Sequence, residues 1–507
     1  MSTTSDKNST KERVDVNEAS SVAEVSGELD SAWKYLDAHR DADAGEAIDM
    51  AALRRRIDWR IVPLMFLCYT LQFLDKVILN YGAVMGLNKD LNLQGNDFSN
   101  LATYLFVGLL LFEIPNTYFL QIFPAAKWLG INVTLWGVAT ACGAAAHNYQ
   151  TLLVSRVFLG IFEATIAPSL MLISSHWYTK SEQAPRFCFW YTGLGIGQII
   201  GGLVSYGFQN MSPDAQLSGW RTMFVVLGVI TVLTGASVIF FLPDTPMKAS
   251  WMSDSEKRAL LRHVSVNQTG IENRKFRAKE IFEALVDPQI YLLLVSVVLL
   301  SVSSGVVTTY SATLIRGLMD NDPKKAALMN TPSGAISIFF TLFVGFGIRL
   351  QSHRWAFILA CIVPAIIGGG LMSFLPSTNK AGCLAGIYLV NAVVAPLAIF
   401  YNWIMANVGG ATKRAFAAAI ISGSFSLGNI IGPQTFQAKD APEFRPAKIA
   451  VMATQAACAV TTFLLFLYYV WQNKRRTSEG EQEDAYMSPE AWSNMTDREN
   501  KKFRYAY

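Results

Sequence analysis

The stretch that decides the fold is QTLLVSRVFLGIFEATIAPSLMLIS, residues 150–174. A bilayer-spanning helix needs about 20 mostly apolar residues, because its backbone must satisfy its own hydrogen bonds in hydrocarbon. The charged residues of the stretch are Arg156 and Glu163, which are seven positions apart and therefore lie on one helical face. This pattern predicts a membrane-spanning helix that carries two charges on one side.

Roughly twelve windows of this length and apolarity follow one another along the chain. They are residues 61–81, 98–121, 128–146, 150–174, 186–208, 220–242, 289–315, 329–349, 354–375, 381–406, 413–436 and 447–471. The longest polar interruption, residues 243–288, separates the windows into six and six. We therefore expect an all-α membrane protein with twelve transmembrane helices in two six-helix halves, a plan that places the substrate between the halves.

Polar segments bound these halves and predict the orientation of the chain. The expected units are a disordered N-terminal tail 1–55 with a short helix near 31–38, a first half 56–242, a central loop 243–288, a second half 289–473 and a C-terminal tail 474–507. The first tail lacks the apolar core of a signal peptide. Most basic residues that flank the spans lie on the side of the tails and the central loop, so all three are predicted to be cytoplasmic. Asn210 begins a glycosylation sequon on the opposite side, in a loop so short that we do not expect modification.

The composition excludes several classes of function. Charged residues make up 16% of the chain and the net charge is +4, whereas soluble domains carry about 25% charged residues. No basic run is interleaved with aromatic residues as nucleic-acid binding would require, and no Walker loop indicates an ATP-driven pump. No nucleophile–base set or metal cluster indicates an enzyme, so we expect no cofactor and no metal. The six cysteines form no CxxC pair, which favours buried free thiols.

Ionisable residues inside the predicted spans are the most informative about function. Asp75 and Lys76 lie in the first span, and Arg156 and Glu163 lie in the fourth. Each costs at least about 2–3 kcal/mol at the bilayer centre unless it is paired or lines a wet cavity. Neighbouring helical positions point about 100° apart, so Asp75 and Lys76 cannot both face a cavity squarely. A buried carboxylate beside a buried cation suits proton coupling, and a guanidinium suits a substrate carboxylate. The alternative is a purely structural ion-pair network.

Other polar and small residues in the spans carry weaker signals. Glu113 precedes Pro115 in the second span and either faces the cavity or satisfies backbone groups at a kink. Gly197 and Gly201 form a GxxxG pair, which favours close helix packing over a dinucleotide loop. Further candidates for lining the cavity, in the seventh and tenth spans, are Tyr310, Tyr401, Asn402 and Asn407.

Five motifs along the chain resemble those of one transporter family. They are LDK (74–76), EIPN (113–116), RVFLGIFEA (156–164), NVGGATKR (407–414) and GNIIGPQTF (428–436). Over about residues 55–475 the chain resembles the fungal allantoate permease family, in the anion:cation symporter branch of the major facilitator superfamily. The loop at residues 123–127 lacks the Gly and Arg of the superfamily's gating motif, so the gate is expected to be held differently.

The resemblance implies a function and roles for the four charges. Asp75 and Glu163 would carry protons, and Lys76 and Arg156 would be their charge partners or would bind the anion. The implied activity is proton symport that imports a small organic anion, such as allantoate or another ureido acid, nicotinate or pantothenate, at the plasma membrane of a fungus. The expected partners are this anion, protons and the lipid bilayer, and the chain is expected to be a monomer. Export of an acidic metabolite and a non-transporting sensor stay open as alternatives.

Overall fold

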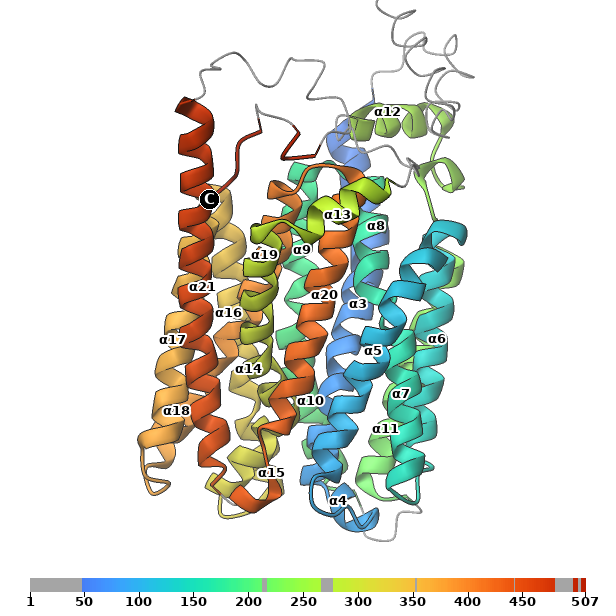
Figure 1. Cartoon of the computed structure of the whole chain (residues 1–507). Coiled ribbons are helices and arrows are strands. Elements are labelled where there is room, and N and C mark those ends of the chain that lie inside the picture. Colours follow the sequence, from blue (N-terminus) through green and yellow to red (C-terminus); the bar gives the residue numbers. More distant parts are fainter. Residues whose placement is uncertain are drawn as a thin grey trace, which may run out of the picture.

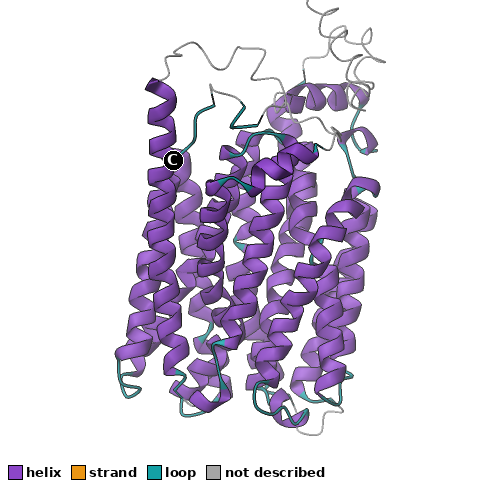
Figure 2. Cartoon of the chain, viewed as in Figure 1, coloured by secondary structure: helices purple, strands orange, loops and turns teal. Residues whose placement is uncertain are grey.

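The computed structural model of the chain is an elongated bundle of helices that run roughly side by side (Figure 1). The structure describes residues 48–507 except 212–216, 266–276, 352, 442, 479–495 and 500–502. The described residues form helices joined by loops (Figure 2). The short helix predicted near 31–38 lies outside the described residues.

The N-terminal half of the bundle runs from α3 to α11. Its elements are α3 (Met50–Val84), α4 (Leu87–Asp90), α5 (Asp97–Ile122), α6 (Ala125–Gly143), α7 (Tyr149–Glu163), α8 (Ile166–Trp177), α9 (Lys180–Tyr191), α10 (Gly193–Phe208) and α11 (Gly219–Phe241). The segment that connects it to the second half contains η2 (Pro246–Lys248), α12 (Asp254–Ser265) and α13 (Ala278–Leu285).

The C-terminal half runs from α14 to α21. Its elements are α14 (Pro288–Leu318), α15 (Pro323–Met329), α16 (Thr331–Leu350), α17 (Arg354–Phe374), α18 (Lys380–Val390), η3 (Asn391–Val393), α19 (Val394–Asn407), α20 (Ala411–Gln434), η4 (Ala438–Asp440) and α21 (Arg445–Ser478). In Figure 1, α12 and α13 lie at one end of the bundle and α4 and α15 at the other. We name these the α13 end and the α4 end.

The predicted spans coincide with helices. Within the described residues, nine helices or adjoining helix pairs are long and apolar enough to cross a membrane. The remaining three predicted windows lie on α5, on α6 and on the pair α9–α10. The all-helical fold predicted from the sequence is therefore confirmed.

Helix starts follow from local capping residues. The Asp49 side chain accepts hydrogen bonds from the second and third backbone N–H groups of α3. Asn148 and Thr151 form a capping box at the start of α7, and Asp287 caps α14, whose first residue is Pro288. Such side chains satisfy N–H groups that have no partner within the helix. The polar residues between the apolar windows therefore fix where each helix begins.

Glycines allow the closest helix contacts. A Cβ atom at Gly201 would lie 2.6 Å from the Tyr81 ring, and one at Gly197 would lie 3.0 Å from the backbone oxygen of Thr70. The GxxxG pair thus packs α10 against α3, as the sequence predicts. On another face of α10, a Cβ atom at Gly195 would lie 2.5 Å from the backbone oxygen of Gly334 on α16. At this contact the backbones of α10 and α16, which belong to opposite halves, touch each other directly.

At the α13 end, Glu182 connects the N-terminal half to α12 of the connecting segment. Its carboxylate accepts hydrogen bonds from Arg54 at 2.6 Å, from the backbone N–H of Thr179 at 3.1 Å and from His263 of α12 at 2.9 Å. Burial alone would raise the pKa of Glu182, but the hydrogen bonds from His263, Thr179 and Arg54 outweigh burial and lower the pKa to about 2. The carboxylate therefore stays ionised and fixes α12 against the bundle.

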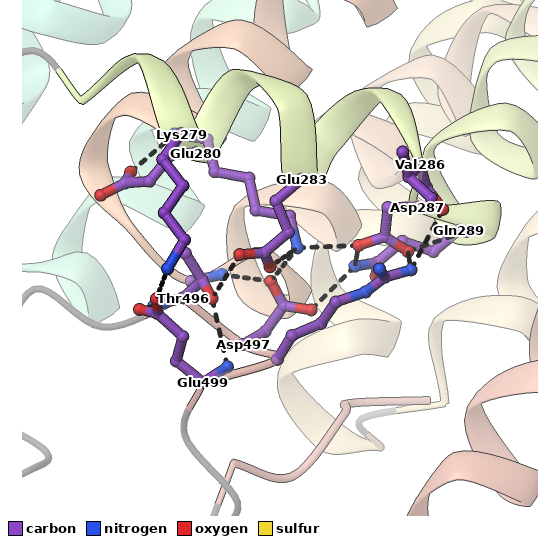
Figure 3. A network of polar contacts seen from close by, with 12 residues as sticks. Lys279, Glu280, Glu283, Val286, Asp287, Gln289, Thr496, Asp497 and Glu499 are labelled. Carbon is purple, nitrogen blue, oxygen red and sulfur yellow. Dashed lines mark hydrogen bonds and ion pairs between the residues drawn. The ribbon is translucent and has the colours of Figure 1, made fainter.

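The last described residues bind the C-terminal half. We name residues 496–499 and 503–507 the C-terminal strap. Asp497 is completely buried, and its Oδ1 lies 2.6 Å from Lys413 Nζ. The same ammonium lies 2.9 Å from Glu283 and 2.8 Å from Asp287. Figure 3 shows these carboxylates converging from α13, from the start of α14 and from the strap. Burial and the nearby Asp497 carboxylate raise the pKa of the Tyr505 hydroxyl, which donates to Asp497 Oδ2 at 2.9 Å.

The strap differs from the polar tail predicted for residues 474–507. Helix α21 continues to Ser478, and Arg476 donates to the backbone oxygens of Phe503 and Asp497. The backbone oxygen of Ala506 accepts hydrogen bonds from Trp403 and Asn407. A polar composition suggests a tail, but here the polar groups are used in contacts with helix ends, which composition alone does not reveal.

Candidate functional site

A cavity lies between the two halves. It is lined by α3, α5, α7, α8, α9 and α10 from the N-terminal half and by α14, η3, α19 and α20 from the C-terminal half. On α3 the lining residues are Tyr69, Gln72, Phe73 and Lys76. Their spacing of three and four residues places all four on one helical face. The cavity is thus formed by side chains that the helical period brings together.

Lys76 and Glu163 form an ion pair at the cavity wall. The Lys76 Nζ lies 2.8 Å from Glu163 Oε1, and the exposed fractions of the two side chains are 11% and 0%. The Lys76 ammonium also lies 5.8 Å from the ring centre of Phe106 and 5.6 Å from that of Phe425. Because Phe425 belongs to α20, the cation of the N-terminal half already contacts the C-terminal half.

Asp75 and Arg156 lie behind this pair, inside the N-terminal half. Each has an exposed fraction of 1%, and neither lines the cavity. Arg156 Nη1 donates to the backbone oxygen of Asp75 at 3.3 Å, and its guanidinium lies over the Phe224 ring. The Asp75 carboxylate accepts from Thr140 at 3.3 Å and interacts electrostatically with Arg156. The four predicted charges therefore divide into a pair at the cavity and a pair in the interior.

Glu113 connects the halves near the cavity. It is 4% exposed, and its carboxylate forms a hydrogen bond with the Ser422 hydroxyl of α20. The Tyr401 hydroxyl also forms a hydrogen bond with Ser422, and both Tyr401 and Ser422 line the cavity. Glu113 therefore makes a contact across the interface between α5 and α20.

The other candidates from the seventh and tenth spans lie elsewhere. The Tyr310 hydroxyl lies 2.5 Å from Ser99 Oγ, toward the α4 end. Asn402 accepts a hydrogen bond from Arg354, and Asn407 binds the backbone of the strap at Ala506. None of the three belongs to the lining of the cavity among the described residues.

Neutral polar residues of the C-terminal half also line the cavity, although they were not among the candidates predicted from the sequence. They are Ser301, Ser304 and Thr308 on α14, and Ser422 and Asn429 on α20. Hydroxyl and amide groups are common in transmembrane helices, so they carry no signal on their own. The spacing of three, four and seven residues on each helix is the signal that could have found them.

Among the described residues, polar side chains of the two halves contact one another near the α4 end. Near the α4 end, Asn80 contacts Ser311 at 3.1 Å, and Gln434 donates to Thr103 at 2.8 Å. The same region contains the hydrogen bond between Asn330 and Tyr81 at 3.0 Å. These side chains come from opposite halves and close the bundle between the cavity and the α4 end.

The described residues provide no metal site. No group of three or more His, Cys, Asp or Glu among them could hold a metal ion. The cysteines whose side chains the structure describes are free thiols, and all but Cys142 are buried. The chemistry of the cavity therefore rests on the Lys76–Glu163 pair and its neutral neighbours.

Comparison with known proteins identifies the class. Residues 65–433 match the Major Facilitator Superfamily. The chain is 36% identical to "Thiamine pathway transporter THI73" of Saccharomyces cerevisiae over 89% of this chain and 86% of that protein. It is 28% identical to "Allantoate permease" of the same yeast over 96% of this chain and 91% of the permease. The chain is a membrane transporter that belongs to the major facilitator superfamily, and it is not an enzyme.

Solved structures support the same fold. The chain is similar to a bacterial homologue of the human lysosomal transporter Spinster in an inward-facing and occupied conformation, with a TM-score of 0.59, 16% identity, and coverage of 80% of this chain and 96% of that one. It is also similar to the xylose transporter XylE from E. coli in a partially occluded inward-open conformation, with a TM-score of 0.60, 17% identity, and coverage of 80% and 97%. At these identities the likeness shows the fold alone.

Proposed function

We propose that the chain is a proton-coupled symporter that imports a small organic anion across the plasma membrane of a fungal cell, and that it works as a monomer. The observation that carries this proposal is the Lys76–Glu163 ion pair at the wall of the cavity between the halves. Its cation matches an anionic substrate, and its carboxylate can take up a proton. No other described group that lines the cavity is charged.

The proposal includes the orientation of the bundle. Twelve spans result if α5, α6 and α9–α10 also cross the membrane, and the basic residues then place the α13 end in the cytoplasm. The cavity would be closed toward the outside by the contacts at the α4 end, and the conformation would be inward-facing. Asn210 would lie outside, where its side chain accepts a hydrogen bond from Lys324 at 2.5 Å. This contact favours an unmodified asparagine.

The ion pair can couple the flux of protons to the flux of the organic anion, because each member of a buried ion pair needs a partner of opposite charge. Protonation of Glu163 removes the negative charge beside Lys76, and the ammonium can then bind the carboxylate of the substrate. Leaving one member of a buried ion pair without its partner costs about 3–5 kcal/mol. A state with a proton but no anion is therefore disfavoured by roughly 10²–10⁴-fold, at 1.4 kcal/mol per factor of ten. One proton and one monoanion would cross together without net charge.

Asp75 and Arg156 would hold the pair in position. Asp75 precedes Lys76 on α3, and Arg156 lies two helical turns before Glu163 on α7. The contact of Arg156 with the Asp75 backbone fixes α7 against α3 at this level. We propose that Asp75 is a second proton carrier and that Arg156 is its charge partner.

The relatives are consistent with this proposal. The names of two similar yeast proteins refer to the thiamine pathway and to allantoate. They support transport of small metabolites by this chain. We propose an anionic metabolite because Lys76 is the cation that lines the cavity.

The test is uptake of radiolabelled small carboxylates, ureido acids, nicotinate and pantothenate among them, at pH 5 and pH 7 in fungal cells that lack their own permeases. We expect accumulation that is greater at pH 5. Glu163→Gln should abolish accumulation against a gradient and retain exchange of labelled for unlabelled substrate. Glu443→Gln, at an exposed carboxylate in the loop before α21, is the matched control and should behave as wild type.

Three results would contradict the proposal. Unchanged accumulation in Glu163→Gln would exclude this carboxylate as the coupling group. Loss of labelled substrate from preloaded cells, without uptake, would indicate an exporter. A fluorescent fusion that remains in an internal membrane would exclude the plasma membrane.

A further inference from the structure

The cavity is chemically asymmetric. Both charged residues that line it, Lys76 and Glu163, come from the N-terminal half. The C-terminal half contributes neutral hydrogen-bonding groups on two neighbouring helices, α14 and α20. A ligand that fills the cavity would therefore meet charge on one side and neutral polar groups on the other.

Two of these neutral groups are buried without a partner. Ser301 is 1% exposed and Asn429 is 0% exposed, and neither Ser301 Oγ nor Asn429 Oδ1 has a hydrogen-bond partner among the described residues. The amide orientation of Asn429 follows from chemistry, because Nδ2 donates to the backbone oxygen of Phe425 at 2.8 Å and an amide oxygen could not. Oδ1 is therefore left as a hydrogen-bond acceptor. Buried polar atoms in this state are rare in proteins, and each needs an explanation.

The two groups lie on helices that are in close contact. A Cβ atom at Gly428 would lie 2.5 Å from the Cβ atom of Ser301. The absent side chain at Gly428 thus allows α20 to approach α14 at the position next to Asn429. Ser301 supplies a hydroxyl, which can donate or accept, and Asn429 supplies an amide oxygen, which accepts.

The separation between Lys76 and Asn429 sets the length of a ligand that binds to both residues. The Lys76 ammonium lies 5.6 Å from the Phe425 ring centre, and Asn429 follows Phe425 by four residues on α20. Four residues correspond to about 6 Å along a helix. A molecule that reaches both groups would have its neutral end about one helical turn from its carboxylate, with the Phe425 ring beside its middle.

We propose that Ser301 and Asn429 form a subsite for a carboxamide or similar amide group of the substrate, and that the transported anion carries a single negative charge. The Asn429 oxygen accepts from the amide N–H, and the Ser301 hydroxyl donates to the amide C=O. A second carboxylate at this position would face the Asn429 oxygen and would lack a cation. This subsite rests on the proposed function, because Lys76 must bind the carboxylate at the other end.

The experiment uses purified full-length protein at pH 5 and measures the shift in unfolding temperature caused by matched probes. The probes are succinamate, succinate and butyrate, together with the longer series glutaramate, glutarate and valerate. In at least one series we expect the carboxamide to bind about tenfold more tightly than the plain monocarboxylate, which corresponds to about 1.4 kcal/mol. A second measurement at pH 7, where the second carboxyl of the dicarboxylate is ionised, should show that the dicarboxylate binds more weakly than either.

Variants separate the subsite from the charge site. Ser301→Ala and Asn429→Ala should each abolish the preference for the carboxamide while butyrate or valerate still binds. Ser424→Ala, at a buried hydroxyl of α20 that does not line the cavity, is the matched control and should keep the preference. Lys76→Ala should abolish binding of every probe.

The outcomes are distinct. Binding that depends on Lys76 but shows no preference for the carboxamide, or a preference that survives both Ser301→Ala and Asn429→Ala, overturns the subsite and leaves the proposed function intact. Equal binding of dicarboxylate and carboxamide at pH 7 also overturns it. If no probe binds, or if Lys76→Ala binds as wild type does, the proposed anion site fails and the subsite fails with it.

Discussion

Replacing Lys413 should destabilise the C-terminal half more than any single change to the carboxylates around it. The ammonium lies 2.6 Å from Asp497, 2.8 Å from Asp287 and 2.9 Å from Glu283, whose side chains are 0%, 1% and 16% exposed. Lys413→Met leaves three buried carboxylates beside one another without their shared cation. Removing one partner from a buried ion pair costs about 3–5 kcal/mol. In Asp497→Asn, Lys413 keeps two carboxylates, but the hydrogen bonds that Asp497 accepts from Gln289, Gly409 and Tyr505 lose their charge assistance, so the loss is about 1.5–3 kcal/mol.

Thermal unfolding of purified protein gives the measurement. For a unit the size of one half, 1 kcal/mol corresponds to a shift of roughly 2–4 °C. Lys413→Met should therefore lower the unfolding temperature by roughly 6–20 °C, and Asp497→Asn by roughly 3–12 °C. The double variant should lose less than the sum, because removing Asp497 relieves repulsion that Lys413→Met creates. Equal shifts for the two single variants, or additive losses, would refute the reasoning.

Three further predictions concern other parts of the bundle. Gly195→Ala should weaken closure at the α4 end, because its Cβ would lie 2.5 Å from the α16 backbone, and a cysteine at Ser311 should become easier to label with maleimide from that side. Glu182→Gln should lower the unfolding temperature at pH 5–7. Since the pKa of Glu182 falls to about 2 from the ordinary value of 4.5, this difference is fully present above pH 4.5 and should shrink as the pH falls toward 2. Arg156→Met should lower the yield of folded protein by leaving Asp75 without its cation, and adding Asp75→Asn should restore part of it.

The sequence predicted the helices well because each window is a long apolar run with polar caps. All twelve windows lie on helices, and the spacing of Gly197 and Gly201 correctly predicted close packing of α10. These features depend on local properties of the sequence: apolar runs that are long enough to cross a bilayer, and glycines that have no side chain. Local patterns of this kind are present in the sequence itself.

The pairing of the charges could not be read from the sequence. Arg156 and Glu163 share a face of α7, but the first lies against Asp75 and the second against Lys76. Which charge meets which depends on the rotation and height of α3 relative to α7, and these come from packing. The strap was missed for a related reason, because Asp497 is polar in sequence and buried only through its contacts with distant helices.

The separation of charge and neutral groups between the halves bears on how binding could lead to movement. Lys76 and Glu163 belong to one half. Glu163 can therefore take up a proton, and Lys76 can bind the substrate carboxylate in its place, without movement of the halves. Asn429 belongs to the other half, so a ligand held by Lys76 and Asn429 together would connect the two. A ligand shifts a conformational equilibrium only through its difference in affinity between the two states. Since contacts across the interface exist only when the halves are close, we expect the neutral end of the substrate to supply that difference, and the ion pair to supply the coupling to protons.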